Sequence, residues 1–97
     1  MVLKLQFEWD ENKNKINQRK HGISFDEVTS VFRDTFAIVF DDPDHSENEE
    51  RFLIIGTSDK RDICLVSHCY SGQDQVIRIT SARKATKTER NIYEEGI

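Results

Sequence analysis

The C-terminal quarter of this acidic chain concentrates cationic side chains. The 97-residue chain carries a formal net charge of -4. The stretch "RITSARKATKTERNIYEEG", residues 78–96, nevertheless opens with five cations and one carboxylate, Glu89. A second basic segment, residues 12–22, has no carboxylate at all. Phosphate is the anion that such clusters meet most often, because arginine offers a planar fork and lysine a compact charge. The alternative is two solvated basic helix faces. The cations concerned are Lys13, Lys15, Arg19, Lys20, Arg78, Arg83, Lys84, Lys87 and Arg90.

Two other side chains near these segments could transfer a proton. His21 follows the basic run of residues 12–20, and an imidazole exchanges protons near neutral pH. Alternatively, His21 only interacts favourably with the C-terminal end of a helix. Tyr93 could donate its phenolic proton or stack on a base, or it could simply pack beside Ile92.

The acidic residues and cysteines do not form a metal-ligand pattern. Six carboxylates lie between Asp41 and Glu50, in a proline-containing stretch that predicts an exposed turn. Cys64, His68 and Cys69 could contribute to a zinc site, but the chain has no matching second pair of ligands. An odd spacing places the two cysteines on opposite faces of one strand, so we expect them to be reduced. We therefore expect neither a metal nor a cofactor.

Length and composition predict one soluble domain spanning residues 1–97. Hydrophobic residues make up 36% of the chain and charged residues 33%, which is typical of a globular protein. No apolar run approaches the roughly 18 residues that span a bilayer. We expect a cytoplasmic protein without a membrane partner.

Periodicity predicts an α+β fold of order β-α-α-β-β-β-β-α. "LKLQFEW" alternates like a strand, and the next helix begins after Asp10 and ends at Gly22. Capping boxes at Ser24–Glu27 and Thr86–Glu89 predict two more helix starts. Four strands follow one another as an antiparallel meander, with the helices on one face of the sheet. Their segments are "TFAIVFDD", "RFLIIGTS", "DICLVSHCY" and "QVIRITSA".

Four pieces in order resemble the BrnT toxin family: "FEWDENK", "KHGISFDEV", "ERFLIIG" and "RITSARKATKTERNIYE". The resemblance covers nearly the whole chain. It implies a RelE-like fold and a ribonuclease toxin of a type II toxin-antitoxin system that inhibits translation. It also implies a BrnA-like ribbon-helix-helix antitoxin as partner, with operator DNA bound only through that antitoxin. A noncatalytic nucleic-acid or protein-binding module, acting as a corepressor, remains the alternative.

Metal-free RNA cleavage drives a ribose 2'-OH onto the neighbouring phosphate and needs a base, an acid and cations. Our candidates for catalysis are His21, Arg51, Arg78, Arg83 and Tyr93, and those for RNA binding are Lys20, Lys84, Lys87 and Arg90. Strict alternation along the last strand places Arg78 on one face and Arg83 on the other. We expect Arg78 and Arg83 to meet Arg51 and the "RKHG" turn in one phosphate pocket.

Overall fold

A five-stranded sheet in the order β1-β5-β4-β3-β2 forms the centre of the fold. The computed structural model describes residues 4–45, 49–72 and 76–96. The strands are β1 (Phe7–Glu8), β2 (Ile38–Asp41), β3 (Phe52–Thr57), β4 (Ile63–Ser71) and β5 (Val76–Lys84). The helices are α1 (Glu11–His21), α2 (Phe25–Val28) and α3 (Lys87–Glu95), with 3-10 helices η1 (Thr29–Arg33) and η2 (Pro43–His45).

The sheet is mixed, whereas the sequence predicted an antiparallel one. Strands β2 to β5 form the antiparallel meander, but β1 pairs in parallel with β5 at Phe7↔Ile77 and Glu8↔Arg78. The direction of β1 depends on a pairing across 70 residues of chain, which local periodicity does not encode. The strand predicted over residues 3–9 is also shorter in the structure, and residues 1–3 lie outside the described part.

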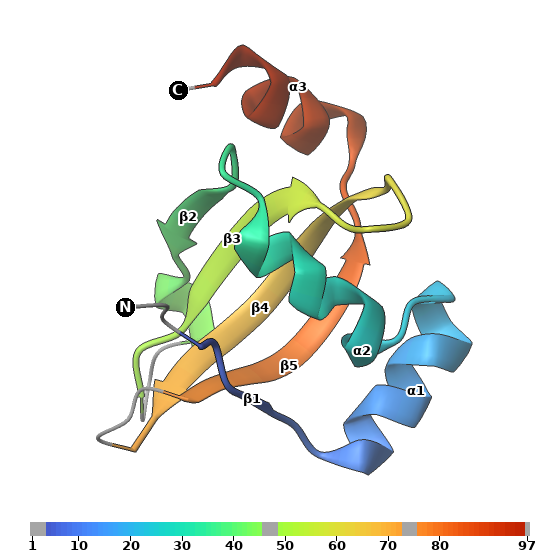
Figure 1. Ribbon diagram of the computed structural model, residues 1–97, viewed down its shortest axis with the longest axis vertical. Coiled ribbons are helices and arrows are strands. Elements are labelled where there is room, and N and C mark those ends of the chain that lie inside the picture. Colours follow the sequence, from blue (N-terminus) through green and yellow to red (C-terminus); the bar gives the residue numbers. More distant parts are fainter. Residues whose placement is uncertain (1–3, 46–48, 73–75, 97) are drawn as a thin grey trace.

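Helix α2 and η1 cover one face of the sheet and build the core with it (Figure 1). The core residues come from the start of this segment and from the inward-facing positions of the central strands. They are Ile23, Phe25, Val28, Val31, Ile54, Cys64, Val66, Ile77, Ile79 and Ala82. Both cysteines are free, as the sequence predicted, and both are buried.

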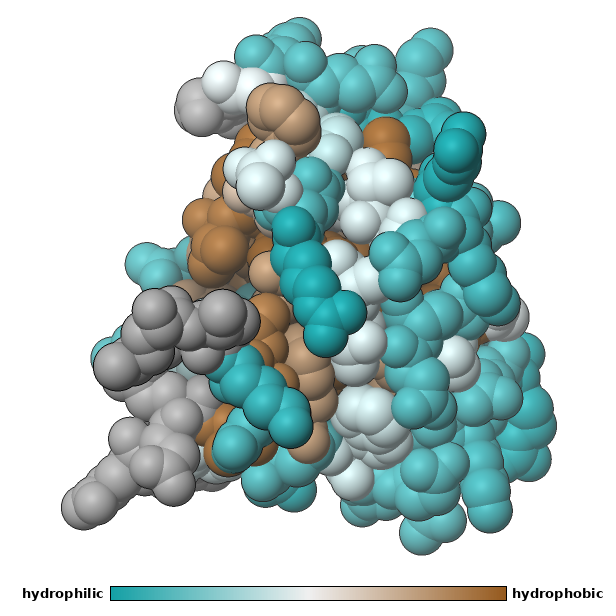
Figure 2. All heavy atoms as spheres, in the orientation of Figure 1, coloured by the Kyte–Doolittle hydropathy of each residue, from teal (hydrophilic) through white to brown (hydrophobic). Residues whose placement is uncertain are grey.

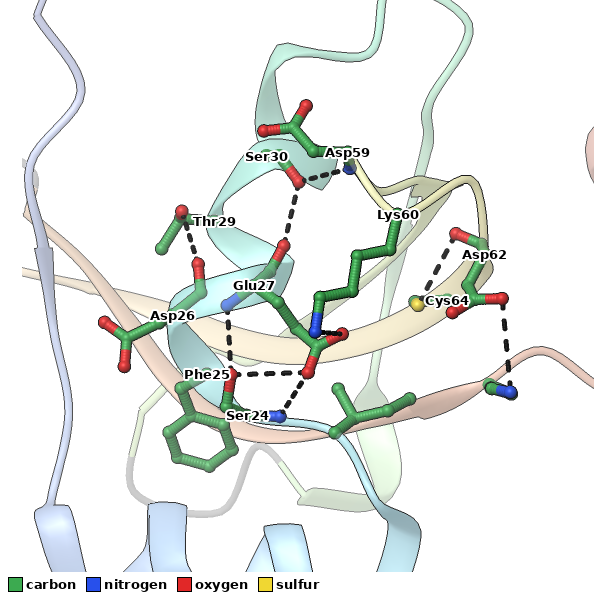
Figure 3. Close-up of polar contacts among 12 residues, drawn as sticks. Ser24, Phe25, Asp26, Glu27, Thr29, Ser30, Asp59, Lys60, Asp62 and Cys64 are labelled. Carbon is green, nitrogen blue, oxygen red and sulfur yellow. Dashed lines mark hydrogen bonds and ion pairs between the residues drawn. The ribbon is translucent and has the colours of Figure 1, made fainter.

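The predicted capping box at Ser24 starts α2 and ties it to the β3–β4 turn (Figure 3). The Ser24 N–H donates to Glu27 Oε1 at 2.9 Å, and the Glu27 N–H donates to Ser24 Oγ at 3.2 Å. One turn later, Ser30 Oγ accepts from the backbone N–H of Asp59 at 2.9 Å. Lys60 lies 3.7 Å from Glu27 across the same junction. These contacts fix α2 and η1 on the sheet.

Helix α1 is attached to the fold by buried amides. Its single apolar residue, Ile16, is 55% exposed, whereas Asn14 and Asn17 are buried. Asn17 Nδ2 donates to the carbonyls of Ile23 at 2.9 Å and Ala82 at 2.7 Å, and the Ala82 N–H donates back to Asn17 Oδ1 at 3.1 Å. Asn17 thus pairs with the backbone of β5 as a neighbouring strand would, and brings α1 to that edge.

Helix α3 lies beyond the end of the sheet and not on the face covered by α2 (Figure 1). This corrects the expectation that all helices share one face. The predicted capping box at Thr86 and Glu89 starts the helix. The helix turns away from the core directly after the short connection that follows β5. For this reason none of its residues is buried.

A β-bulge in β5 changes which face of the sheet its later side chains point to. Ser67 pairs with Ser81 but His68 pairs with Ile79, so Thr80 is an extra residue on β5. The buried positions shift accordingly from Ile77 and Ile79 to Ala82. Arg83 therefore lies on the same face as Arg78, and the strict alternation predicted from sequence is wrong for this strand.

The surface on the helix side is divided between apolar and polar halves. Figure 2 shows hydrophobic side chains gathered to the left of α2, toward β2 and β3, and hydrophilic ones over α1. The exposed apolar residues include Phe36, at 75% exposed, with Val39 and Tyr70. No helix of the described segments is long and apolar enough to cross a membrane.

Candidate active site

The sheet face opposite the core carries a cation-lined hollow of about 350 Å³. The cross-strand row Leu53–Ser67–Ser81 forms its floor and alternates with the core row Ile54–Val66–Ala82. The residues lining it are Lys13, Asp42, Arg51, Leu53, Leu65, Ser67, Thr80, Ser81 and Arg83. Charge above a floor of hydroxyls and leucines makes this hollow suitable for a phosphate with its ribose.

A second hollow of about 310 Å³ adjoins the first and shares Leu53, Leu65, Ser67, Ser81 and Arg83 with it. It adds Lys20 and His21 from the end of α1. The structure thus places Lys20 and His21 of the "RKHG" turn in a hollow with Arg83, and Arg83 also lines the first hollow together with Arg51. The anchoring of α1 by Asn17 makes this possible, because His21 lies one turn further along the same helix.

Asp42 does not fit the prediction that residues 41–50 form an exposed acidic turn. It is buried and lines the first hollow. Its N–H donates to the Arg51 carbonyl at 2.9 Å, which extends the pairing of β2 with β3 by one residue. Among the described residues that line the first hollow, Asp42 is the one carboxylate, beside the cations Lys13, Arg51 and Arg83. The acidic stretch also includes residues 46–48, which lie outside the described part.

Arg83 is held by a bidentate ion pair with Glu89. The Nη1 and Nη2 atoms of Arg83 donate to Glu89 Oε1 at 2.7 Å and Oε2 at 2.9 Å. The hydrogen bond from Arg83 is the main cause that lowers the pKa of Glu89, and the same bond raises the pKa of Arg83. The Arg83 side chain is 37% exposed. It is therefore a cation oriented by the Glu89 carboxylate.

The charges of Arg51 and Arg78 both influence the pKa of the Cys69 thiol. Burial is the main cause that raises the pKa of Cys69, Glu49 adds to it, and the charges of Arg51 and Arg78 oppose it. Arg51 also lies 3.8 Å from Glu49. Arg78 is exposed and does not line either hollow. It is on the predicted face, but along the strand from the other cations.

Tyr93 is placed away from the two hollows. Its hydroxyl donates to Asp34 Oδ2 at 2.5 Å and accepts from Thr57 Oγ1 at 2.9 Å. Burial would raise the pKa of Asp34, but the hydrogen bonds from Tyr93, Thr57 and Phe36 lower it overall. Burial and the bond to Asp34 raise the pKa of Tyr93. The tyrosine therefore links α3 to β3 and to the segment before β2.

The remaining cations predicted to bind RNA are divided between two places. Lys20 lines the second hollow. Lys84 and Arg90 line a separate hollow of about 360 Å³, and Lys84 lies 4.0 Å from Asp62. Lys87 is exposed at the first position of α3. The C-terminal cluster is therefore not one surface, because Arg83 and Lys84 point to opposite faces of β5.

Sequence reasoning named Lys13 as part of a basic segment but did not choose it for the site, and it missed the hydroxyl groups. Lys13, Asn17 and Lys20 are spaced at i, i+4 and i+7, which places them on one face of a helix. That spacing was the available signal. Thr80 Oγ1 bonds the carbonyl and the hydroxyl of Ser67, each at 3.1 Å. No sequence signal indicated this bond, because it depends on the bulge.

Within residues 4–45, 49–72 and 76–96, no group of three or more His, Cys, Asp or Glu residues could hold a metal ion. His68, which the zinc hypothesis included, is fully buried beside Phe32, with ring centroids 4.8 Å apart. Burial lowers its pKa, because a charged imidazole is disfavoured away from water.

Comparison with known proteins places these observations in a family. A search of curated protein sequences gives no match. The solved structure of the Brucella abortus ribonuclease toxin BrnT is similar, with a TM-score of 0.65 and 24% identity, covering 87% of this chain and all of that one. The family model described as "Ribonuclease toxin, BrnT, of type II toxin-antitoxin system" matches residues 9–89. The chain therefore belongs to the BrnT family of ribonuclease toxins.

Proposed function

We propose that this BrnT-family toxin cleaves RNA without a metal ion at the two adjoining hollows, in the manner of RelE-like messenger-RNA interferases, and thereby inhibits translation. The observation that carries the proposal is the convergence of Lys13, Lys20, His21, Arg51 and Arg83 on one face of the sheet. These residues come from three separate segments of the chain. A merely solvated basic helix face would not require that convergence.

The reaction is an intramolecular transfer at phosphorus. The ribose 2'-oxygen attacks the neighbouring phosphate, the bond to the 5'-oxygen breaks as that oxygen takes up a proton from the solvent, and a 2',3'-cyclic phosphate and a free 5'-hydroxyl remain. His21 accepts the proton from the 2'-hydroxyl, since its imidazole lines the second hollow and histidine is the side chain most often used as a general base. Arg51 and Arg83 stabilise the additional negative charge of the transition state.

Cleavage of a labelled RNA by the purified protein in excess EDTA tests this proposal. We expect cyclic phosphate ends and an undiminished rate, because protein cations stabilise the transition state. His21→Ala should lower kcat by about 100-fold, whereas Lys15→Ala, on the same helix, serves as a control with little effect. Loss of cleavage in EDTA that magnesium restores would contradict the mechanism. RNA binding without cleavage would instead favour a noncatalytic corepressor.

The antitoxin of this system is a BrnA-like protein with a ribbon-helix-helix part, and only through it does the toxin reach operator DNA. A carboxylate-bearing segment of that partner lies over the hollows and neutralises Lys13, Lys20 and Arg83. Such masking keeps the toxin inactive in the cytoplasm. Co-purification with the product of the neighbouring gene tests this, together with inhibition of RNA cleavage in the complex. A complex that still cleaves RNA would place the antitoxin elsewhere.

A further inference from the structure

The donors of Arg83 can be counted individually. A guanidinium has five N–H donors: two on Nη1, two on Nη2 and one on Nε. Nη1 donates to Glu89 Oε1 at 2.7 Å and to the Lys84 carbonyl at 3.3 Å, while Nη2 donates to Glu89 Oε2 at 2.9 Å. Three donors are thus engaged with the protein, and the second Nη2 hydrogen and the Nε hydrogen have no part in those contacts.

The two remaining donors form a second fork. Nε–H and the outer Nη2–H lie on one edge of the planar guanidinium and point in the same direction. An arginine edge of this kind binds two oxygens of a phosphate. Arg83 lines both hollows, and its bonds to Glu89 and to the Lys84 carbonyl do not use this edge, so the edge can take a phosphate bound there. The ion pair with Glu89 therefore leaves Arg83 able to bind a phosphate.

Glu89 is itself fixed to the backbone at the start of α3. Its Oε1 accepts from the Thr86 N–H at 2.8 Å, and its own N–H donates to Thr86 Oγ1 at 3.2 Å. The Glu89 side chain is only 22% exposed. A carboxylate held in this way fixes the plane of the guanidinium that it binds. The flexible arginine side chain is thereby oriented before RNA arrives.

We infer that Glu89 is a positioning residue for RNA cleavage: it holds Arg83 by one edge so that the opposite edge can bind the scissile phosphate. The inference rests on the proposed function, and it gives the C-terminal capping box a second role. Glu89 touches neither the RNA nor the reacting atoms. It acts through Arg83, and this dependence can be measured.

Glu89→Gln is the appropriate variant because glutamine keeps the cap while the ionic fork is lost. Its carbonyl oxygen still accepts from the Thr86 N–H, but its amide nitrogen opposes a guanidinium N–H. We expect kcat for RNA in EDTA to fall at least about tenfold, and the affinity for RNA to fall as well, because the edge that binds the phosphate is no longer held in place. Arg83→Ala should lower kcat by about 100-fold. Lysine at position 83 should restore the rate only partly, because an ammonium has no fork.

Thr86→Ala is the matched control. It removes the hydroxyl that caps α3, but it leaves the backbone N–H that anchors Glu89. The melting temperature should fall while kcat stays within about twofold of wild type. The double variant Glu89→Gln, Arg83→Ala should be no slower than Arg83→Ala alone, since Glu89 acts only through Arg83.

Three results would overturn the inference: an undiminished rate for Glu89→Gln, a higher rate, or additive losses in the double variant. If the wild-type protein cleaves no RNA, the proposed function fails, and the fork is tested by affinity for a fluorescent 2'-O-methyl RNA. Losses of affinity in both Glu89→Gln and Arg83→Ala that do not add in the double variant would then support the fork. Unchanged affinity would exclude it.

Discussion

Helix α1 carries cations of the proposed site and α3 carries Glu89, the partner of Arg83, but the two helices are attached by different chemistry. Helix α1 is fixed by the buried amides of Asn14 and Asn17, which bond backbone groups at 2.7 to 3.1 Å. Helix α3 has no buried residue and is held by Arg83–Glu89 and Tyr93–Asp34. Amides do not titrate, whereas contacts to carboxylates depend on charge.

This difference separates the two parts of the proposed site. Lys13, Lys20 and His21 sit on an element whose position depends on buried neutral hydrogen bonds. Arg83 depends on a partner that solvent and acid can reach. Burial strengthens a hydrogen bond and raises the cost of losing it. We therefore expect α1 to behave as part of the core and α3 as a separately detachable element.

The largest expected effect comes from Asn17→Ala. It removes the partners of the Ala82 N–H and of the Ala82 and Ile23 carbonyls. We expect the free energy of unfolding to fall by about 3 kcal/mol, because buried backbone groups lose their hydrogen bonds. Urea denaturation measures this. Ile16→Ala, at an exposed position on the same helix, should change it by less than about 0.5 kcal/mol. Equal effects of the two substitutions would contradict amide anchoring.

As the pH is lowered, we expect α3 to lose its attachment to the sheet at a higher pH than α1 does. The pKa of Asp34 and that of Glu89 are both lowered from their ordinary values of 3.8 and 4.5. Their contribution to stability is therefore fully present above those values and is lost as the pH falls through the lowered ones. Amide hydrogen exchange, expressed as protection factors at neutral and acid pH, measures the difference. Equal loss of protection in α1 would show that the whole domain responds together.

The smallest effect is expected for Tyr93→Phe. The hydroxyl that links Asp34 and Thr57 is lost, and the free energy of unfolding should fall by about 1 kcal/mol. RNA cleavage should be unchanged, because Tyr93 does not line the hollows. A large fall in kcat with unchanged stability would instead assign proton transfer to Tyr93. Phe36→Ala, which removes an exposed ring near Asp34, controls for surface changes.

Local signals in the sequence determined where the elements begin and end. The N-cap at Asp10, the left-handed Gly22 with φ of 70° and the capping boxes at Ser24 and Thr86 all appear in the structure. Each depends on contacts within four residues, or on a backbone conformation that glycine adopts easily. The four strands of the meander were also predicted from local signals, namely runs of apolar and β-branched residues between turn residues.

The arrangement of the site was decided only by tertiary structure. The bulge at Thr80, the parallel pairing of β1 with β5 and the bonds from Asn17 to Ala82 join residues far apart in the chain. Their register is set by packing and by which backbone groups remain without a strand partner, and no local pattern encodes either. The sequence by itself therefore determined that cations gather in two segments. The folded sheet decided that Arg83 faces His21 and Arg51, and that Lys84 does not.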